Sequence, residues 1–176
     1  MKILVGLSGS IATYRSPDFV KALVARGHEV RVALTASASN FVGLKSLETF
    51  AGAKPYTHDH FDPEHLGTDH IDVARWADVM VMYGATAGSL GKWAGGLADD
   101  FLSTQYLAFR GPVVIAAAMN PQMWAHPAVK ANVAKLQSYG NRFCGPIAGI
   151  VACGEEGIGH IATIEDIVAM VEAARS

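Results

Sequence analysis

The sequence predicts an α/β fold, with one domain built on a doubly wound parallel sheet. Short β-branched and apolar runs alternate along the chain with segments of helical periodicity, which is typical of strands joined by helical crossovers. Loops of small residues follow these runs, where a strand would pass into a helix. The chain has 176 residues, of which 51% are hydrophobic, so residues 1–176 suit a single domain. We therefore expect a flavodoxin-like or Rossmann-like sheet with helices on both faces.

The first half of the chain begins with an apolar run at residues 3–7, which predicts a strand that ends at a Gly/Ser turn. A helix should follow from about residue 10 to residue 26, because Gly27 terminates it. Pro17 is compatible with this helix only in its first turn or at a kink. Residues 29–34 predict the second strand.

The second half repeats the pattern. The apolar run at residues 79–83 predicts a strand, and the β-branched run at residues 113–115 predicts a buried parallel strand. Residues 71–76 predict a short amphipathic turn. Helical segments are expected near residues 47–50, after the small-residue turn at residues 84–89 up to about residue 94, and over about residues 98–108, 127–139 and 163–174.

Two hydroxyl-rich loops follow neighbouring strands. Gly9 and Ser10 come after the first strand, and residues 35–41, which include Ser37 and Phe41, come after the second. Small residues at a helix start let backbone N–H groups approach a phosphate, although ordinary helix N-caps would look the same. The first loop has neither a GxGxxG pattern nor a Walker lysine.

The segment from Ala117 to Trp124 is the strongest candidate for a site. It follows a predicted parallel strand, and open α/β sheets bind ligands beyond the carboxyl ends of strands. Asn120 offers an amide that donates and accepts hydrogen bonds beside Met123 and Trp124. The same residues would also suit a plain turn, with Asn120 as N-cap and Pro121 at the first helical position.

The segment at residues 147–160 is rich in glycine and carries Cys153. We expect it to be a mobile lid over the site, ahead of the last helix. Cys144 and Cys153 are the two cysteines, and without a CxxC pattern they suit free thiols in a reducing, cytoplasmic compartment.

Charge and composition exclude several functions. The net charge of −2, with scattered Lys and Arg, disfavours nucleic acid and anionic membranes, and no run approaches the ~20 apolar residues of a spanning helix. A signal peptide is not expected either. His58, His60 and His65, with Asp59 and Asp62, lack the fixed spacing of a metal site, so we predict none. His70 stands before residues 71–76 and suits either a structural role or a base poised near neutrality.

Together these motifs resemble the flavin-containing cysteine decarboxylases, a family that includes phosphopantothenoylcysteine decarboxylase and the lantibiotic peptidyl-cysteine decarboxylases. The resemblance covers nearly the whole chain. Residues 9–12 are similar to the family's flavin-binding loop. His70-Ile71, together with residues 76–78, is similar to the family's active-site histidine segment. Residues 84–89 stand in place of Pro-Ala-Ser-Ala-Asn-Thr, and residues 117–124 in place of Pro-x-Met-Asn-x-x-Met-Trp.

The resemblance implies FMN, rather than FAD, as cofactor. It implies His70 as catalytic base, Asn120 at the substrate's carboxylate with Met123 and Trp124 beside it, and Cys153 as a lid cysteine. It also implies homotrimers or dodecamers whose sites are completed across a subunit boundary. The residues that the family assigns to FMN correspond to Gly9, Ser10, Ile11, Ser37, Phe41, Ala85, Thr86 and Ala118.

Some residues depart from the family pattern. Gly84 and Gly88 replace Pro and Asn, and Ala117 replaces a Pro, so we expect looser turns on the flavin side. His160-Ile161 replaces the Arg-Met that usually follows the lid. Ala152-Cys153-Gly154 is similar to the lid motif of the coenzyme A pathway enzyme, although Cys153 could also be an inert hydrophobe.

The decarboxylation that the resemblance implies is also chemically reasonable in its own right. A carboxylate leaves only if its electron pair has an acceptor, and oxidation of the cysteine side chain to a thioaldehyde provides one, with a flavin taking the hydride. The leading interpretation is decarboxylation of phosphopantothenoylcysteine, and the alternative is a peptide ending in cysteine. Other readings are a flavin prenyltransferase, which shares the fold, and a flavin-binding regulator without catalysis.

Overall fold

The computed structural model describes residues 1–60 and 68–175 of the chain. Its central element is a five-stranded parallel sheet in the order β2-β1-β3-β4-β5. This order is the flavodoxin-like one, so the predicted fold class is confirmed. The strands are β1 (Lys2–Leu7), β2 (Glu29–Leu34), β3 (Val79–Ala85), β4 (Val113–Ala117) and β5 (Arg142–Phe143).

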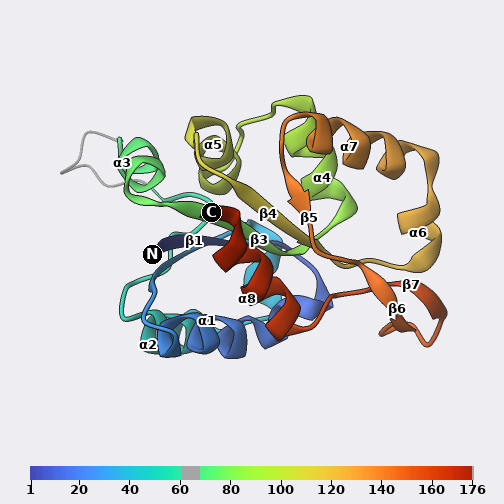
Figure 1. Ribbon diagram of the computed structural model, residues 1–176, viewed down its shortest axis with the longest axis horizontal. Coiled ribbons are helices and arrows are strands. Elements are labelled where there is room, and N and C mark those ends of the chain that lie inside the picture. The colour runs from blue at the N-terminus through green and yellow to red at the C-terminus, as the bar shows by residue number, and fades with distance from the viewer. Residues whose placement is uncertain (61–67, 176) are drawn as a thin grey trace.

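Helices cover both faces of the sheet (Figure 1). On one face lie α1 (Ser16–Ala25), α2 (Leu44–Ala51) and α8 (Ile164–Glu172). On the other lie α3 (Asp69–Trp76), α4 (Ala87–Gly95), α5 (Phe101–Ala108) and α7 (Pro127–Ser138). Among the described residues, no helix has both the length and the apolar character needed to cross a bilayer.

The strand periodicity determines which core each side chain enters. In β3, Val79, Val81 and Tyr83 belong to the core under α1 and α8, whereas Met80 and Met82 belong to the core under α4 and α5. Successive side chains of a strand point to opposite faces, so a strand buried on both sides is apolar throughout. This is why the strands could be predicted from continuous apolar runs.

The helix expected between residues 10 and 26 is divided in the structure. A 3-10 helix, η1 (Ile11–Arg15), precedes α1, and Pro17 lies in the first turn of α1, where its missing N–H costs nothing. Residues 36–40 likewise form a 3-10 helix, η2 (Ala36–Asn40). The single-helix expectation for residues 10–26 was wrong because the Pro17 ring interrupts the hydrogen bonding upstream.

The glycine-rich segment that we expect to be a mobile lid contains a hairpin. Its strands β6 (Ile147–Ile150) and β7 (Glu156–His160) pair antiparallel as a separate two-stranded sheet. The hairpin is held to the body of the protein by the Met119 N–H, which donates to the Gly159 carbonyl at 3.1 Å. A side chain at residue 159 would collide with the Met119 carbonyl oxygen, so this close approach requires glycine.

We predict that Phe19→Ala lowers the free energy of unfolding by about 3–5 kcal/mol, the usual cost of emptying a buried phenylalanine site. Phe19 is 0% exposed and stacks on Tyr83 with ring centroids 4.8 Å apart. Urea unfolding followed by circular dichroism measures the change. Val24→Ala on the same helix, 38% exposed, is the matched control and should shift stability by less than about 1 kcal/mol. Equal effects of the two substitutions would contradict this description of the core.

Candidate active site

Three loops meet at the carboxyl edge of the sheet. The Ser8 hydroxyl donates to the Gly84 carbonyl at 2.6 Å and accepts from the Thr86 N–H at 3.1 Å. The Ala118 N–H donates to the Ala85 carbonyl at 3.1 Å, and the Ser10 hydroxyl donates to the Ala118 carbonyl at 3.4 Å. The loops after β1, β3 and β4 are thereby joined into one rim, as parallel strands ending at one edge predict.

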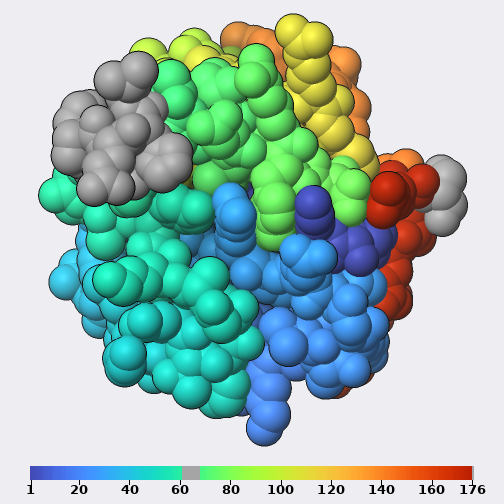
Figure 2. Space-filling model, turned by 90° about the vertical axis from the view of Figure 1, so that its left-hand side faces the viewer, coloured from blue at the N-terminus to red at the C-terminus, as the bar shows by residue number. Residues whose placement is uncertain are grey.

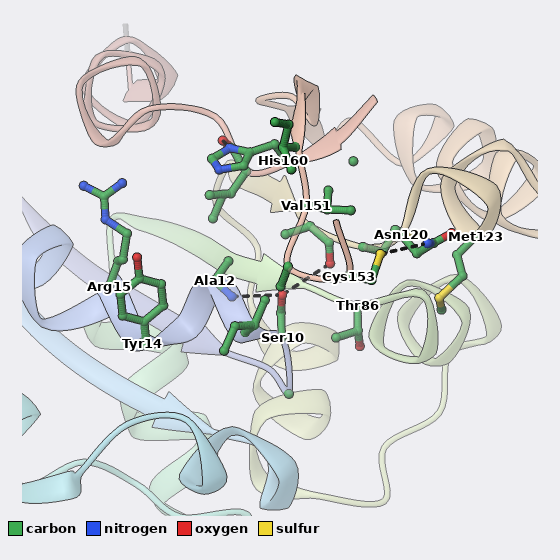
Figure 3. A pocket seen from close by; sticks show the side chains of 18 residues that line it. Ser10, Ala12, Tyr14, Arg15, Thr86, Asn120, Met123, Val151, Cys153 and His160 are labelled. Atoms are coloured by element: carbon green, nitrogen blue, oxygen red, sulfur yellow. Dashed lines mark hydrogen bonds between the residues drawn. The ribbon is translucent and has the colours of Figure 1, made fainter. Parts of the chain in front are cut away.

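A cavity of about 470 Å³ opens at this rim beneath the β6–β7 hairpin (Figure 3). This volume lies in the usual range for small-molecule sites. The walls are mainly apolar, with a small number of hydrogen-bonding and basic groups. They are formed by Gly9, Ser10, Ile11, Ala12, Tyr14, Arg15, Thr86, Ala118, Met119, Asn120, Met123, Ile150, Val151, Ala152, Cys153, Gly159, His160 and Ile161.

Asn120 serves as a helix cap and still presents an amide to the cavity. It precedes α6 (Pro121–Ala125), and its Oδ1 atom accepts from the Gln122 N–H at 2.8 Å. Its Nδ2 atom lies 3.4 Å from the Cys153 Sγ atom, a contact drawn as a dashed line in Figure 3. The cap fixes which end of the amide is the acceptor, so the NH₂ group faces the cavity as a donor.

Cys153 lies in the tight connection between β6 and β7. The Val151 N–H donates to the Glu155 carbonyl at 2.9 Å, and the Gly154 N–H donates to the Val151 carbonyl at 2.8 Å. The Cys153 thiol is exposed, whereas Cys144 is buried. Burial, and secondarily the nearby Asp166 carboxylate, raise the pKa of the Cys144 thiol, which keeps it protonated and unreactive. Cys153 is therefore the thiol available to a ligand.

The structure brings eight of the predicted site residues to the wall of this cavity. They are Gly9, Ser10, Ile11, Thr86, Ala118, Asn120, Met123 and Cys153. Ser37 adjoins the rim, because a side chain at Gly9 would meet its Cβ atom, and Ala85 contributes its backbone carbonyl. Phe41 follows η2 and is not part of the wall. Trp124 packs against the core, with the Lys130 ammonium 4.2 Å from its ring centroid.

His70 does not lie with the other predicted catalytic residues. It is on α3, which lies at the opposite end of the molecule from α6 and β7 (Figure 1). Figure 2 shows the end that carries α3, whose surface is formed mainly by the N-terminal half of the chain, coloured blue to green. One chain therefore does not bring His70 to Asn120 and Cys153.

Sequence reasoning missed several residues of the cavity. Tyr14 and Arg15 belong to η1 and line the wall four and five residues after Ser10, and their place just after the predicted loop could have indicated them. His160, noted only as a departure, is the last residue of β7, and its Nδ1 atom lies 2.8 Å from the Ile161 carbonyl oxygen.

No group of three or more His, Cys, Asp or Glu side chains in residues 1–60 and 68–175 could hold a metal ion. His58, Asp59 and His60 belong to this part of the chain. His65 and Asp62, from the same His/Asp-rich stretch, lie outside the described residues.

Comparison with known proteins agrees with this geometry. The model of the flavoprotein family matches residues 1–176. The coenzyme A biosynthesis bifunctional protein CoaBC of Bacillus subtilis is 39% identical over 170 residues, and that of Escherichia coli K12 is 38% identical over 173. These alignments cover 97% and 98% of this chain but 42% of each relative, so the chain spans about two-fifths of the curated proteins it matches.

Solved structures give the same result. A cysteine-to-serine mutant of PPC decarboxylase, complexed with pantothenoylaminoethenethiol, superposes with a TM-score of 0.86 at 28% identity, covering 98% of this chain and 96% of that one. The FMN-dependent cysteine decarboxylase SpaF superposes with a TM-score of 0.84 at 31% identity, covering 100% of this chain and 98% of the other. The resemblance inferred from the sequence is therefore confirmed.

Proposed function

Because this chain belongs to the flavoprotein family, we propose that it is an FMN-dependent decarboxylase acting on a terminal cysteine, with residues 1–176 forming its single flavoprotein domain. The observation that carries the proposal is the contact between the Asn120 amide and the Cys153 thiol inside one apolar cavity. The flavoprotein match and the names of the relatives support it.

The residues of the rim fit a flavin. Gly9, Ser10 and Ile11 with Thr86 and Ala118 would hold FMN, and Ser37, Phe41 and Ala85 would support them from the flanking loops. The cavity has mainly apolar walls suited to a planar ring, and the small residues keep backbone close to it. Bound FMN would accept the hydride that leaves when the cysteine side chain is oxidised.

The chain's own residues would then control the carboxylate and the protons. The Asn120 NH₂ group would donate to the substrate carboxylate and align its C–C bond for departure of carbon dioxide. The hairpin would exclude water above Met123. His70 would take the thiol proton, and the electron pair left by carbon dioxide would pass into the thioaldehyde to give an enethiolate. Return of the proton from His70 would give the enethiol.

His70 must reach the cavity from a second copy of the chain, because it lies at the far end of its own. We therefore propose a homo-oligomer, either a trimer or a dodecamer assembled from trimers, in which α3 of one copy closes the cavity of the next. Trp124, which is partly buried on α6 next to Met123, would contact substrate in that assembly.

The preferred substrate is phosphopantothenoylcysteine, and a peptide ending in cysteine is the alternative. The PPC decarboxylase and CoaBC relatives favour the first, and the cysteine decarboxylase SpaF is compatible with either. Cys153 also favours phosphopantothenoylcysteine, since reduction of the enethiol to the saturated thiol needs a proton, which a thiol facing the Asn120 amide can supply, and a hydride, which the reduced flavin would supply. Incubating the FMN-loaded protein with each substrate, followed by mass spectrometry, tests this directly. Loss of carbon dioxide from neither substrate would refute the proposal.

Asn120→Asp should separate the capping role of residue 120 from its chemical role. The aspartate keeps an oxygen to accept from the Gln122 N–H, but it loses the NH₂ donor and repels a carboxylate. We expect kcat/KM to fall on the order of 100-fold, because a hydrogen bond to a charged group contributes roughly 1.5–3 kcal/mol and repulsion adds to its loss. The melting temperature should stay near that of the wild type. Wild-type kcat/KM in this variant would contradict the assignment.

Cys153→Ser should stop the reaction at the enethiol. Carbon dioxide would still be released, but the hydroxyl is a much weaker acid than the thiol and would not return the proton. Mass spectrometry of the product distinguishes the enethiol from the saturated thiol. Release of the enethiol by the wild type as well would contradict a reductive role for Cys153 and favour the peptide branch.

Mixing two impaired variants should test the shared site. His70→Asn and Asn120→Asp each disable one half of a site, so an oligomer formed from both contains some sites with both native residues. We expect partial activity after co-refolding, measured against each variant refolded alone. Mixed oligomers without activity would contradict completion of the site by a second copy.

A further inference from the structure

A second cavity lies near the start of β4, away from the rim described above. Its volume is also about 470 Å³, and it opens where α4, α5 and α7 end. Its lining includes none of the residues that line the first cavity. The proposed decarboxylation gives this cavity no role.

Four aromatic residues contribute to the wall of this second cavity. Trp93 and Tyr106 form a tilted pair with ring centroids 5.7 Å apart, and Phe109 and Tyr139 add two further rings. Gly96 leaves open space, since a side chain there would meet no atom within 4 Å. A flat ring could therefore lie against these side chains with little rearrangement.

The buried Asn141 amide and the Tyr106 phenol add hydrogen-bonding groups beside the aromatic rings. Asn141 is 8% exposed, and its Nδ2 atom donates to the Leu136 carbonyl at 2.9 Å and to the Tyr106 hydroxyl oxygen at 2.8 Å. A carbonyl only accepts, so the amide orientation is fixed and both N–H groups are used. Among the described residues, no hydrogen bond uses the Asn141 Oδ1 atom or the proton of Tyr106. Burial raises the pKa of Tyr106, which keeps that proton in place.

The charged side chains of this cavity favour a ligand with its anionic group at the mouth and a neutral ring in the interior. Arg110 and Lys135 are exposed at the edge, and no lining residue is acidic. The carboxyl ends of three helices make the interior favour N–H donors over an anion. A ligand for this cavity needs a planar ring with neighbouring donor and acceptor atoms, joined to an anionic group.

We propose that the second cavity binds a nucleoside monophosphate. The base would lie among Trp93, Tyr106 and Tyr139, with one donor on Asn141 Oδ1 and one acceptor at the Tyr106 hydroxyl. The phosphate would contact Arg110 and Lys135 at the mouth.

Equilibrium dialysis of the full chain with AMP, GMP, CMP and UMP tests the proposal. Each nucleotide is measured with and without saturating FMN, so that binding in the first cavity is recognised by its loss. Adenosine and inorganic phosphate, measured alongside, separate the contributions of base and phosphate. We expect at least one nucleotide to bind in the presence of FMN, and more tightly than adenosine or phosphate.

Arg110→Gln and Lys135→Gln should each weaken that binding about tenfold, and Tyr106→Phe should weaken it several-fold. Lys130→Gln is the matched control, because Lys130 is on the same helix but lies over Trp124, and it should leave affinity unchanged. The proposal fails if no nucleotide binds, if FMN abolishes binding, or if the Arg110 and Lys135 variants bind like the wild type. It also fails if these variants instead change the oligomeric state, since the cavity would then be an interface between copies.

Discussion

The Ser8 hydroxyl is the interaction on which the rest of the site depends. It is buried between the loops after β1 and β3, where it donates to the Gly84 carbonyl and accepts from the Thr86 N–H. The Ser8 carbonyl in turn accepts from the Thr13 hydroxyl at 2.7 Å, which joins η1 to the same point. An unpaired polar group at this depth would be costly, so these bonds hold the loops in one arrangement. The cavity takes its shape from that arrangement.

Gly84 shows how a departure from the family pattern is accommodated. We expected a glycine in place of proline to loosen this turn. Instead, Gly84 has φ +70° at a register shift between Tyr83 and Ala85, a conformation that proline does not adopt. A side chain there would also meet the Thr13 Oγ1 atom at 2.8 Å. The turn is therefore a specific bulge that directs Thr86 toward the cavity, and its hydrogen bonds to Ser8 make it well defined.

The parts of the fold that the sequence predicted are those governed by local periodicity and by strand ends. Strands buried on both faces read as apolar runs, and loops at one edge of a parallel sheet must converge, so Ser10, Thr86 and Asn120 could be grouped in advance. The β6–β7 hairpin was missed because glycines weaken the strand pattern. The pairing of Asn141 with Tyr106 joins residues 35 positions apart, and no local pattern encodes such a contact.

The distance of His70 from the cavity of its own chain limits how the proposed chemistry can take place. Val73 and Ala74 form the buried face of α3, so this helix is packed against the body of the protein. Moving it to the cavity would expose that apolar surface. The cavity lies at the other end of the sheet, beyond the reach of a side-chain rearrangement. If His70 is the base, as we propose, catalysis requires contact between two copies of the chain. Assembly would then control activity directly, since an isolated chain would hold the amide and the thiol without the His70 imidazole beside them.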